Sequence, residues 1–465
     1  MRFFMTLLLI GSIEARGAEW RVGAAAVDVT PALGTPMAGY YSPRGAESVH
    51  DPLFAKAIVV ENEGRKIALV SLDLITTTRD LVVEARKEIE RLSHIQSESV
   101  MISATHTHTG PVVASATARD VALGGSNELA TRFRAELPAR IAEAVRRADD
   151  RLVPAKIWAA RGSESSIAFN RRYHMKDGTV GWNPGKLNPN VLKPAGTIDP
   201  EVPFVYCESL DRKPIAIYIN YAVHLDNVGG TSFSADMPYT LSRMIAEFKG
   251  KDLISVFTAG CCGDVNHINT NWREVQHGHE NAVRMGVILA GSVLSAWPEL
   301  EAIEPARIDA RSVTVELATS PIEPGDLDRA RAVLAAIESK RKPAPSFLET
   351  VKAYKVMDVN DRSGKPLEVE VQTIALGEKL AFVSLPGEIF VELGLAVKQD
   401  SPFPYTIIAE LANGSIGYIP SRRAYPQGNY EVVSARCAQG SGEVLVDAAV
   451  RLLKESNLKV KREAK

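Results

Sequence analysis

This chain of 465 residues has few cysteines and no large excess of charge of one sign. The 4 cysteines include no Cys-x-x-Cys pair, which argues against a thiolate zinc knuckle and against a disulfide scaffold. We expect them to be small buried hydrophobic residues, with pairing of Cys207 and Cys437 in an oxidising compartment as the alternative. The formal net charge of −2 argues against a generally basic nucleic-acid binder, and the 45% of hydrophobic residues excludes a mainly disordered chain.

Long apolar runs are lacking as well. The apolar run Phe3–Ile10 is too short to span a bilayer, which takes about 20 apolar residues. It follows the basic Arg2 and precedes the small residues around Ala18, a pattern typical of a secretory signal peptide. We therefore predict a signal peptide over residues 1–18, cleavage near Ala18, and a secreted or periplasmic protein without a transmembrane span. A buried first strand or a lipid-facing anchor is the alternative.

Apolar strands and amphipathic helices alternate along most of the chain. Buried strands are expected at residues 66–73, 100–103, 215–221, 253–258, 379–384 and 405–410, and helices at 79–92, 129–148, 238–248, 280–295, 324–338 and 442–454. This alternation predicts an α/β fold of mixed β-sheets flanked by helices, for which four layers in the order α-β-β-α are one form. We expect one domain over residues 19–465, with a helical insertion near 321–361 and a long ordered loop over 171–197.

The chemistry has to come from residues other than the common nucleophile motifs. No Gly-x-Ser-x-Gly elbow and no Gly-x4-Gly-Lys-Ser/Thr phosphate loop occurs. The loops that follow the predicted strands instead carry His106, His108, His224, Asp264, Glu388 and Tyr418. Because ligands bind outside the carboxyl ends of strands in open α/β sheets, these loops predict one shared site.

His106 and His108 are two positions apart in a segment that we expect to be extended, so that both side chains leave on the same face. Two adjacent imidazoles suit one metal ligand with a neighbour, or two ligands, and a surface pair is the alternative. His224 would otherwise be a satisfied core histidine. Glu388 would otherwise be a first-turn acid of a helix expected over 388–397.

The remaining candidates also have structural explanations. Tyr418 and Tyr430 would otherwise be aromatic residues packed in loops, and Asp264 would orient a loop or a ligand or stabilise its own turn. His277 and His279 form a second pair with the same spacing, which we expect at a solvated helix N-terminus.

A series of short motifs follows one order along the chain: DVTP (28–31), MAGY (37–40), HDPL (50–53), THTHTGP (105–111), NR (170–171), AVH (222–224), GDV (263–265), LPGE (385–388), and GY (417–418) followed by YE (430–431). Together they resemble the neutral, non-lysosomal ceramidases from about residue 23 to about residue 431. The THTHTGP run and the matched order make the resemblance specific.

The resemblance implies a catalytic zinc ion and a role for each matched residue. The implied zinc ligands are His106, His224, Glu388 and Tyr418, and His108 would be the acid/base residue. Arg171, or Arg172 beside it, would bind the carbonyl oxygen as it becomes an oxyanion, together with Tyr430. Such a site suits amide cleavage, because zinc polarises a carbonyl and lowers the pKa of bound water to about 7, and fixed donors stabilise the oxyanion.

This chain departs from the family at two places. The family pattern Gly-Asp-Val-Ser-Pro-Asn reads Gly-Asp-Val-Asn266-His267-Ile here, so no role of that serine carries over. We also expect the C-terminal β-sandwich that family members usually carry to be absent.

The leading hypothesis is a zinc-dependent amidase that cleaves the N-acyl bond of ceramide-like sphingolipids to a fatty acid and a sphingoid base. Its partner would be a small, lipid-like amide rather than a nucleic acid. The alternatives are a zinc hydrolase of another amide or ester, including a sugar-linked one, and a zinc-containing envelope binding protein without catalysis.

Overall fold

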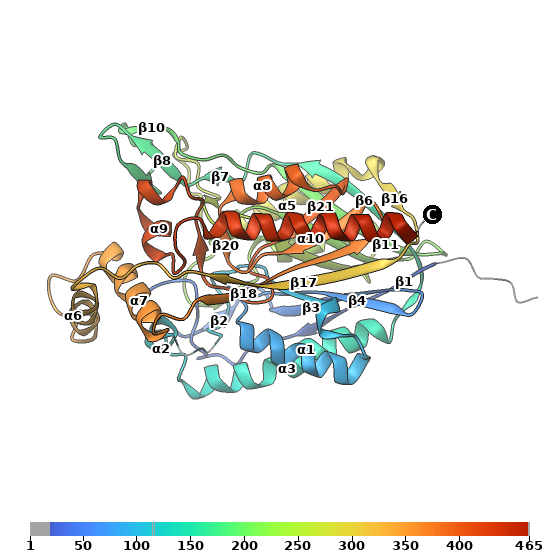
Figure 1. The fold of residues 1–465 in the computed structure, drawn as a ribbon, viewed down its shortest axis with the longest axis horizontal. Coiled ribbons are helices and arrows are strands. Elements are labelled where there is room, and N and C mark those ends of the chain that lie inside the picture. The colour runs from blue at the N-terminus through green and yellow to red at the C-terminus, as the bar shows by residue number, and fades with distance from the viewer. Residues whose placement is uncertain (1–18, 114, 116, 464–465) are drawn as a thin grey trace, which may run out of the picture.

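The structure is a computed structural model that describes residues 19–463, except positions 114 and 116. The predicted signal peptide therefore lies outside the described residues. Figure 1 shows two β-sheets packed on each other, with helices on both outer faces. The predicted α/β class is confirmed, and the layers follow the order α-β-β-α.

The larger sheet has the strand order β14-β12-β11-β6-β1-β3-β4-β5, with β16 paired to β6. Most neighbours are antiparallel, but β4 with β5 and β12 with β14 are parallel pairs. Its strands are β1 (Trp20–Asp28), β3 (Phe54–Asn62), β4 (Arg65–Leu72), β5 (Val100–Ala104), β6 (Val153–Ser163), β11 (Glu201–Ser209), β12 (Pro214–Tyr221), β14 (Ile254–Ala259) and β16 (Glu301–Ile303).

The second sheet has the order β17-β18-β19-β21, in which β19 and β21 are parallel. Its strands are β17 (Ile308–Leu317), β18 (Leu367–Leu376), β19 (Leu380–Ser384) and β21 (Tyr405–Ala409). Short pairings complete the strands: β2 (Ser48–Val49) with β13 (Ser232–Phe233), β7 (Phe169–Asn170) with β15 (Val265–Asn266), β20 (Glu388–Ile389) with β22 (Tyr418–Ile419), and β8 (Arg172–Met175) with β9 (Val180–Trp182) and β10 (Val191–Pro194).

The helices are α1 (Arg79–Ser93), α2 (Ala118–Ala122), α3 (Glu128–Asp149), α4 (Met237–Lys249), α5 (His279–Ser295), α6 (Asp326–Glu338), α7 (Phe347–Asp361), α8 (Val391–Asp400), α9 (Tyr430–Ser434) and α10 (Ser441–Glu463). None of the described helices combines the length and the apolar character that crossing a bilayer requires.

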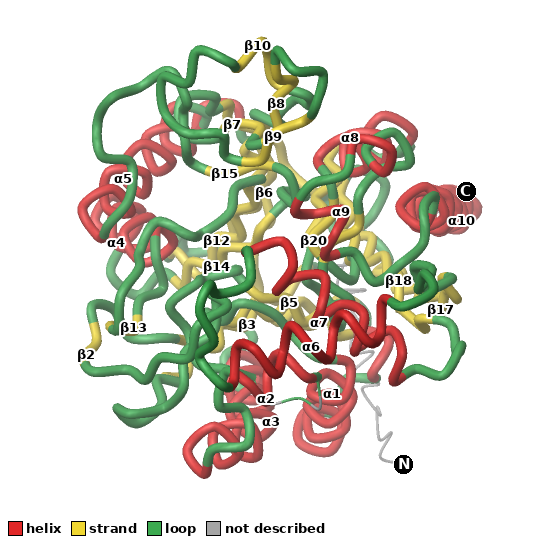
Figure 2. Tube along the Cα trace, turned by 90° about the vertical axis from the view of Figure 1, so that its left-hand side faces the viewer, coloured by secondary structure: helices red, strands yellow, loops and turns green. Residues whose placement is uncertain are grey.

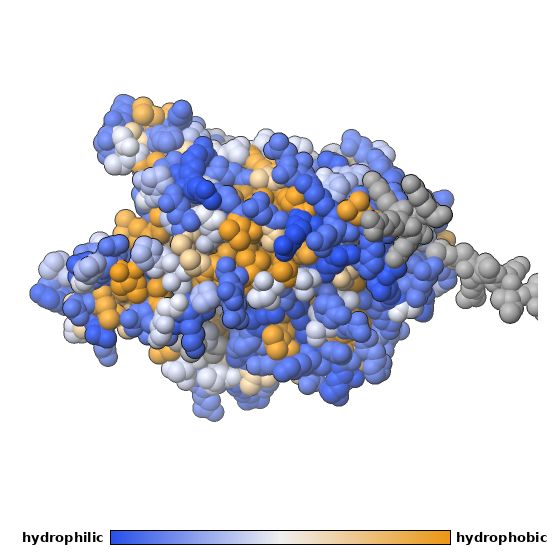
Figure 3. Space-filling view, in the orientation of Figure 1, coloured by the Kyte–Doolittle hydropathy of each residue, from blue (hydrophilic) through white to orange (hydrophobic). Residues whose placement is uncertain are grey.

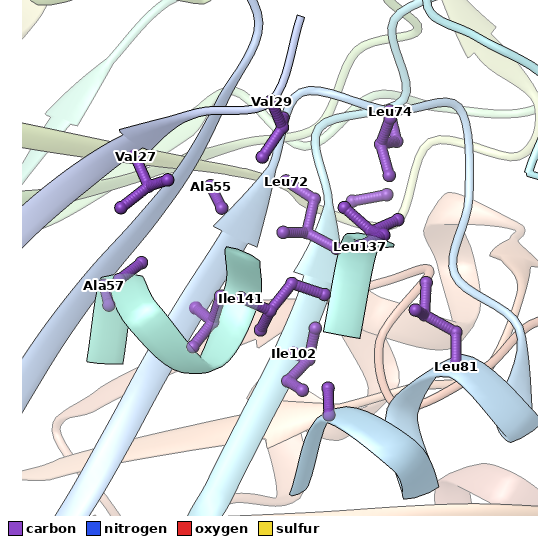
Figure 4. Packing of buried hydrophobic residues seen from close by; sticks show 14 of the residues in the cluster. Val27, Val29, Ala55, Ala57, Leu72, Leu74, Leu81, Ile102, Leu137 and Ile141 are labelled. Carbon is purple, nitrogen blue, oxygen red and sulfur yellow. The ribbon is translucent and has the colours of Figure 1, made fainter. Parts of the chain in front are cut away.

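Alternation of side chains along the strands builds the layers. In β12, Ala216 and Tyr218 face the second sheet, whereas Ile217 and Ile219 face α4 and α5. Residues of β1, β3 and β4 alternate in the same way, and their outward side chains pack against α1 and α3 (Figure 4). Helices α8 and α10 cover the outer face of the second sheet. Both sheets are therefore covered on both faces, which explains why strands such as β5 and β19 are buried at every position, whereas the outer strand β17 alternates half-buried and exposed residues along its middle.

The predicted strands and helices are confirmed, mostly to within one or two residues, and β4, α1 and β5 form the predicted βαβ-like unit. Two expectations are wrong. Residues 171–197 are not one long loop, because they contain β8, β9 and β10. Glu388 does not begin a helix: it lies in β20, and α8 begins at Val391. Region 321–361 contains α6 and a second helix, α7.

All 4 cysteines are free and buried, as expected for small hydrophobic residues. Cys207 packs between the two sheets, whereas Cys437 lies in the layer between the second sheet and α10. The alternative of a Cys207–Cys437 disulfide is therefore wrong. Burial raises the pKa of the Cys207 thiol to about 12, so this thiol is inert at neutral pH.

Candidate metal centre

The candidate site lies where the parallel strands of both sheets end. The loops after β5, β12 and β19 carry His106, His224 and Glu388, and the loop after β21 leads to Tyr418. Single backbone bridges join these loops, one between Thr107 and Leu225 and another between Ser103 and Ala412. Figure 2 looks onto this end of the molecule, with β5, β12, β14, β20, α7 and α9 gathered around it. The structure thus brings the predicted side chains of these loops together at one end of the molecule.

Four side chains from these loops meet at one point. The Glu388 Oε2 atom lies 3.4 Å from His106 Nε2 and 3.2 Å from His224 Nε2. Tyr418 Oη lies 3.4 Å from His224 Nε2. A tetrahedral ion with ligands at about 2.0 to 2.1 Å spaces its ligand atoms roughly 3.3 Å apart. The observed separations therefore fit one small divalent cation among these donors.

Backbone carbonyls fix the orientation of the two histidine rings. Nδ1 of His106 lies 2.8 Å from the Ile75 carbonyl oxygen, and Nδ1 of His224 lies 2.8 Å from that of Cys262. When Nδ1 donates to a carbonyl, Nε2 is left to carry the lone pair, and in both rings Nε2 points at the meeting point. Because imidazole lone pairs, a carboxylate and a phenol oxygen face one another there, a positive charge between them would offset their repulsion.

His108 belongs to the same cluster. Its Nε2 lies 3.4 Å from His106 Nε2, and its Nδ1 lies 3.0 Å from the Gly39 carbonyl oxygen. His106, His108 and His224 offer ligand atoms that all lie within 4.8 Å of one another. Two overlapping ligand sets therefore fit a metal ion. They share His106 and His224 and differ in whether His108 or the Glu388–Tyr418 pair completes the site.

His106 and His108 lie side by side as predicted, but the reason is different. The segment is not extended, because His106 has a φ of 74°, in the left-handed region that residues with a Cβ rarely adopt. The two rings meet edge to face with centroids 4.8 Å apart. The bridge from Thr107 to Leu225 and the hydrogen bond from the His108 N–H to the Leu225 carbonyl hold this turn. Backbone strain of this kind is found where a site fixes its conformation.

Burial and neighbouring charges shift the pKa values of the cluster in the absence of a cation. Burial lowers the pKa of His108 to about 3, and the neighbouring His106 contributes. Burial likewise lowers the pKa of His224 to about 4. Burial opposes ionisation of Glu388, but the neighbouring His106 and His224 rings hold its pKa well below the usual value. His108 and His224 are therefore neutral at pH 7, the state in which a histidine accepts a proton or a metal.

The arginine that reaches the cluster is Arg171. Its Nη2 donates to Tyr418 Oη at 3.0 Å and to the Gly263 carbonyl at 2.8 Å. Arg172 points the other way, toward the Gly428 carbonyl. Both guanidinium groups are buried and share the fully buried Glu431, which accepts from Arg171 Nε at 2.9 Å and from Arg172 Nη1 at 2.7 Å. Of the two adjacent arginines, only Arg171 contacts the site.

Tyr430 lies at the start of α9 and forms one wall of the site. Its ring centroid is 5.2 Å from that of Tyr418, and the guanidinium carbon of Arg171 lies 5.8 Å from the ring centre. On its other side it packs against Trp182 at 4.6 Å and Phe347 at 5.2 Å. Phe347, the first residue of α7, therefore completes a wall of aromatic rings beside the site. Figure 3 shows apolar side chains at this end of the molecule.

Asp264 is buried beside the site without reaching the metal-ligand cluster. Its two oxygens accept from the Val391 N–H at 2.8 Å and from Asn170 Nδ2 at 2.7 Å. It thereby joins the first residue of α8 to the residue before Arg171, which is the predicted role of orienting loops. Burial raises the pKa of Asp264 to about 6.

Two further features beside the site, Glu410 and the close contact of Asp226 with His267, were not predicted from the sequence. Fully buried Glu410 accepts from the Ile389 N–H at 2.8 Å and from Cys262 Sγ at 2.9 Å, so it joins β20 to the loop after β14. Asp226 Oδ1 lies 2.9 Å from Nδ1 of the buried His267. Glu410 ends an apolar run and Asp226 follows His224 by two positions, which were the only signals in the sequence.

The second histidine pair lies at the start of α5. His279 begins α5, but its ring stacks on His50 at a centroid distance of 4.7 Å, and its Nε2 lies 3.3 Å from Asp51 Oδ1. His277 is exposed and the His279 side chain is 38% exposed, so the pair lies at a solvated helix N-terminus as expected.

Comparisons with known proteins give one family match and two structural matches. Residues 20–227 match the family model "Neutral/alkaline non-lysosomal ceramidase, N-terminal". A crystal structure of neutral ceramidase from Pseudomonas aeruginosa superposes with a TM-score of 0.73 and 18% identity, covering 94% of this chain and 75% of that chain. A structure described as ceramidase complexed with C2 superposes with a TM-score of 0.73 and 17% identity, covering 94% and 76% of the two chains. A search of curated proteins gives no match.

Proposed function

We propose that this protein is a zinc-dependent amidase, because residues 20–227 match the neutral/alkaline non-lysosomal ceramidases, as the motifs indicated, and 94% of the chain superposes on a neutral ceramidase. The proposed substrates are ceramide-like N-acyl sphingoid bases, which would be cleaved to a fatty acid and an amine. The observation that carries the proposal is the meeting of four donors from distant loops at separations of 3.2 to 3.4 Å.

We assign the zinc ion to His106, His224, Glu388 and Tyr418. When bound, zinc would polarise the amide carbonyl and make a nucleophile of water at neutral pH. Nitrogen and oxygen donors with an open position are the ligand set of catalytic zinc sites. Tyr418 is an unusual ligand, since burial raises the pKa of its phenol well above 10 in the absence of a cation, but Arg171 opposes this shift and stabilises the phenolate.

His108 is assigned the proton transfers. Its Nδ1 faces the Gly39 carbonyl, so its Nε2 is free to accept the proton of the attacking water and return it to the leaving amine. An amide nitrogen leaves only as the neutral amine, which makes this returned proton essential to the cleavage. In this assignment His108 lies beside the zinc ligands rather than among them.

Arg171 and Tyr430 are assigned to the carbonyl oxygen. Arg171 already donates to Tyr418 Oη, so its guanidinium is directed at the site, and Glu431 holds it from behind. Donors fixed in this way stabilise the oxyanion without having to reorganise, and losing one typically costs about 10²–10³ in kcat.

The decisive experiment combines metal analysis with an assay. Purified protein should contain about one zinc per chain and release fatty acid from a fluorescent ceramide. His108→Ala should keep its zinc and lose activity, whereas Glu388→Ala should lose both. Zinc retention with hydrolysis of other amides or esters, but not of ceramide, would favour the second hypothesis. Protein that binds zinc and ceramide without hydrolysing any substrate would be a binding protein.

We also propose that the chain is exported and that residues 19–465 form one catalytic domain with α6 and α7 as a helical insertion. N-terminal sequencing of the mature protein from an expressing cell tests the first point. A first residue near Glu19 is expected, and an intact Met1 in protein from the membrane fraction would favour the lipid-facing anchor.

A further inference from the structure

One carboxylate beside the catalytic histidine has no assigned task. The bridge from Thr107 to Leu225 and the hydrogen bond from the His108 N–H to the Leu225 carbonyl, 3.1 Å long, place the next residue, Asp226, beside His108. The charge of Asp226 acts on His108 and also on Tyr40, whose ring lies edge-on to the His108 ring at 6.1 Å. Asp226 therefore lies on the rim of the site, on the His108 side.

His267 holds this carboxylate in place and leaves part of it accessible. The His267 side chain is 2% exposed and its Nδ1 lies 2.9 Å from Asp226 Oδ1, whereas the Asp226 side chain is 23% exposed. Within the part of the chain that the structure describes, Asp226 Oδ1 is buried without an aligned hydrogen bond although His267 is close, and no hydrogen bond reaches Oδ2. An ionised carboxylate has room for about four hydrogen bonds, so this one is poorly satisfied.

Arg44, a basic residue on the same rim, does not donate to the Asp226 carboxylate either. Arg44 lies over the Tyr40 ring, with its guanidinium carbon 4.2 Å from the ring centre. Its nitrogens donate to the backbone carbonyls of Ala38, His108 and Gly230. The rim therefore presents an anionic acceptor whose partner would have to come from outside the chain.

The two sides of the site differ in character. On the side of Arg171 and Tyr430, the walls are aromatic and the donors point at a carbonyl oxygen. On the side of His108, the group that receives a proton is the leaving amine. In this assignment Asp226 therefore lies next to the amine half of a bound amide.

We propose that Asp226 is a specificity-determining residue that accepts a hydrogen bond from a donor on the amine half of the substrate, either a hydroxyl or an ammonium group. This inference rests on the proposed amidase function, because the role of His108 defines which half of the substrate lies nearby. His267 is the positioning residue that holds the carboxylate toward the substrate.

Three amides with one acyl chain test the proposal. Their amine halves are 2-hydroxyethyl, 2-aminoethyl and propyl, so that they carry a hydroxyl, an ammonium group or no donor. Binding is measured by calorimetry on zinc-loaded protein with His108→Ala, which holds substrate without turnover, and hydrolysis is measured on protein with His108 intact. The variants are Asp226→Ala and Asp226→Asn, and Asp211→Ala, an exposed carboxylate that pairs with Lys213, is the control.

At least one donor-bearing amide should bind about tenfold or more tightly than the propyl amide, because a hydrogen bond to a charged group is among the stronger ones. Asp226→Ala should abolish this preference, and Asp226→Asn should abolish the preference for ammonium while keeping part of that for hydroxyl. Zinc content and melting temperature should stay unchanged in the asparagine variant. Preference for only one donor identifies which group the substrate carries.

Equal binding of all three amides, or a preference that survives Asp226→Ala, overturns the proposal. These results come from binding alone, so they do not depend on turnover. Failure of the amidase function has a separate signature: no fatty acid is released from any of the three amides by protein with His108 intact.

Discussion

Glu388 and Tyr418 lie opposite each other in a parallel pairing of two-residue strands, β20 and β22. The next residues in the two strands, Ile389 and Ile419, form the second pair of this bridge. Both are buried in the layer beneath α8 and α10. The pairing fixes a carboxylate and a phenol side by side on the face that meets His106 and His224. It also ties together two loops that follow the neighbouring parallel strands β19 and β21.

This pairing predicts that the metal stabilises the fold and depends on both residues. Removal of the metal with a chelator should lower the melting temperature, and returning zinc should restore it, because zinc at 100 times its Kd stabilises the folded state by about 2.7 kcal/mol. Glu388→Gln and Tyr418→Phe should each reduce the metal-dependent part of this shift. Equal melting temperatures with and without metal would contradict the assignment.

Substitution of Arg171 and of Arg172 should distinguish a loss of catalysis from a loss of stability. Both pair with the buried Glu431, so Arg171→Lys and Arg172→Lys should destabilise the protein by similar amounts, of about 1–3 kcal/mol, since each leaves a buried carboxylate oxygen poorly paired. Only Arg171→Lys should lower kcat, by about 10²-fold, with zinc retained. Measurements of kcat, zinc content and urea unfolding on both variants decide this, and equal losses of kcat would disprove the assignment.

Glu410 predicts a pH dependence of stability. Burial raises the pKa of its carboxyl from 4.5 to about 8 in the folded protein. A raised folded pKa means that the contribution to stability is fully present below pH 4.5 and is lost as the pH rises toward 8. Glu410→Gln should flatten this decline, because its oxygen can accept from the Ile389 N–H and its amide can donate to Cys262 Sγ. Urea unfolding at several pH values measures the free energy of unfolding of both proteins without metal. The same pH dependence in the original protein and in Glu410→Gln would contradict the prediction.

Phe347 should matter for activity although it is 41% exposed. Its ring stacks on Trp182 at 5.4 Å and packs edge-on against Tyr41 at 5.5 Å, and it supports the Tyr430 ring. Phe347→Ala should therefore lower kcat/KM with zinc content unchanged. Neighbouring Leu348, which is 37% exposed and lies outside this aromatic wall, provides the control variant Leu348→Ala. A similar change in both variants would mean that α7 acts only through its general packing.

Local patterns predicted most of the architecture. Strand β4 and helix α1 were predicted almost residue by residue, because burial on both faces of a strand and on one stripe of a helix leaves a period in the sequence. Alternation of such elements was enough to indicate an α/β fold with a site at the strand ends. Short elements such as β8, β9 and β20 were missed because two to four residues carry no readable period.

The sequence by itself determined the kinds of donor and their order along the chain, since His106, His224, Glu388 and Tyr418 follow strands that must be buried. Only the tertiary structure decided how they meet. The left-handed turn at His106, the choice of Arg171 over Arg172 and the pairing of Asp226 with His267 depend on contacts between segments far apart in the chain. Such contacts leave no local pattern, because the free energy that enforces them comes from the packing of both sheets and not from neighbours in sequence.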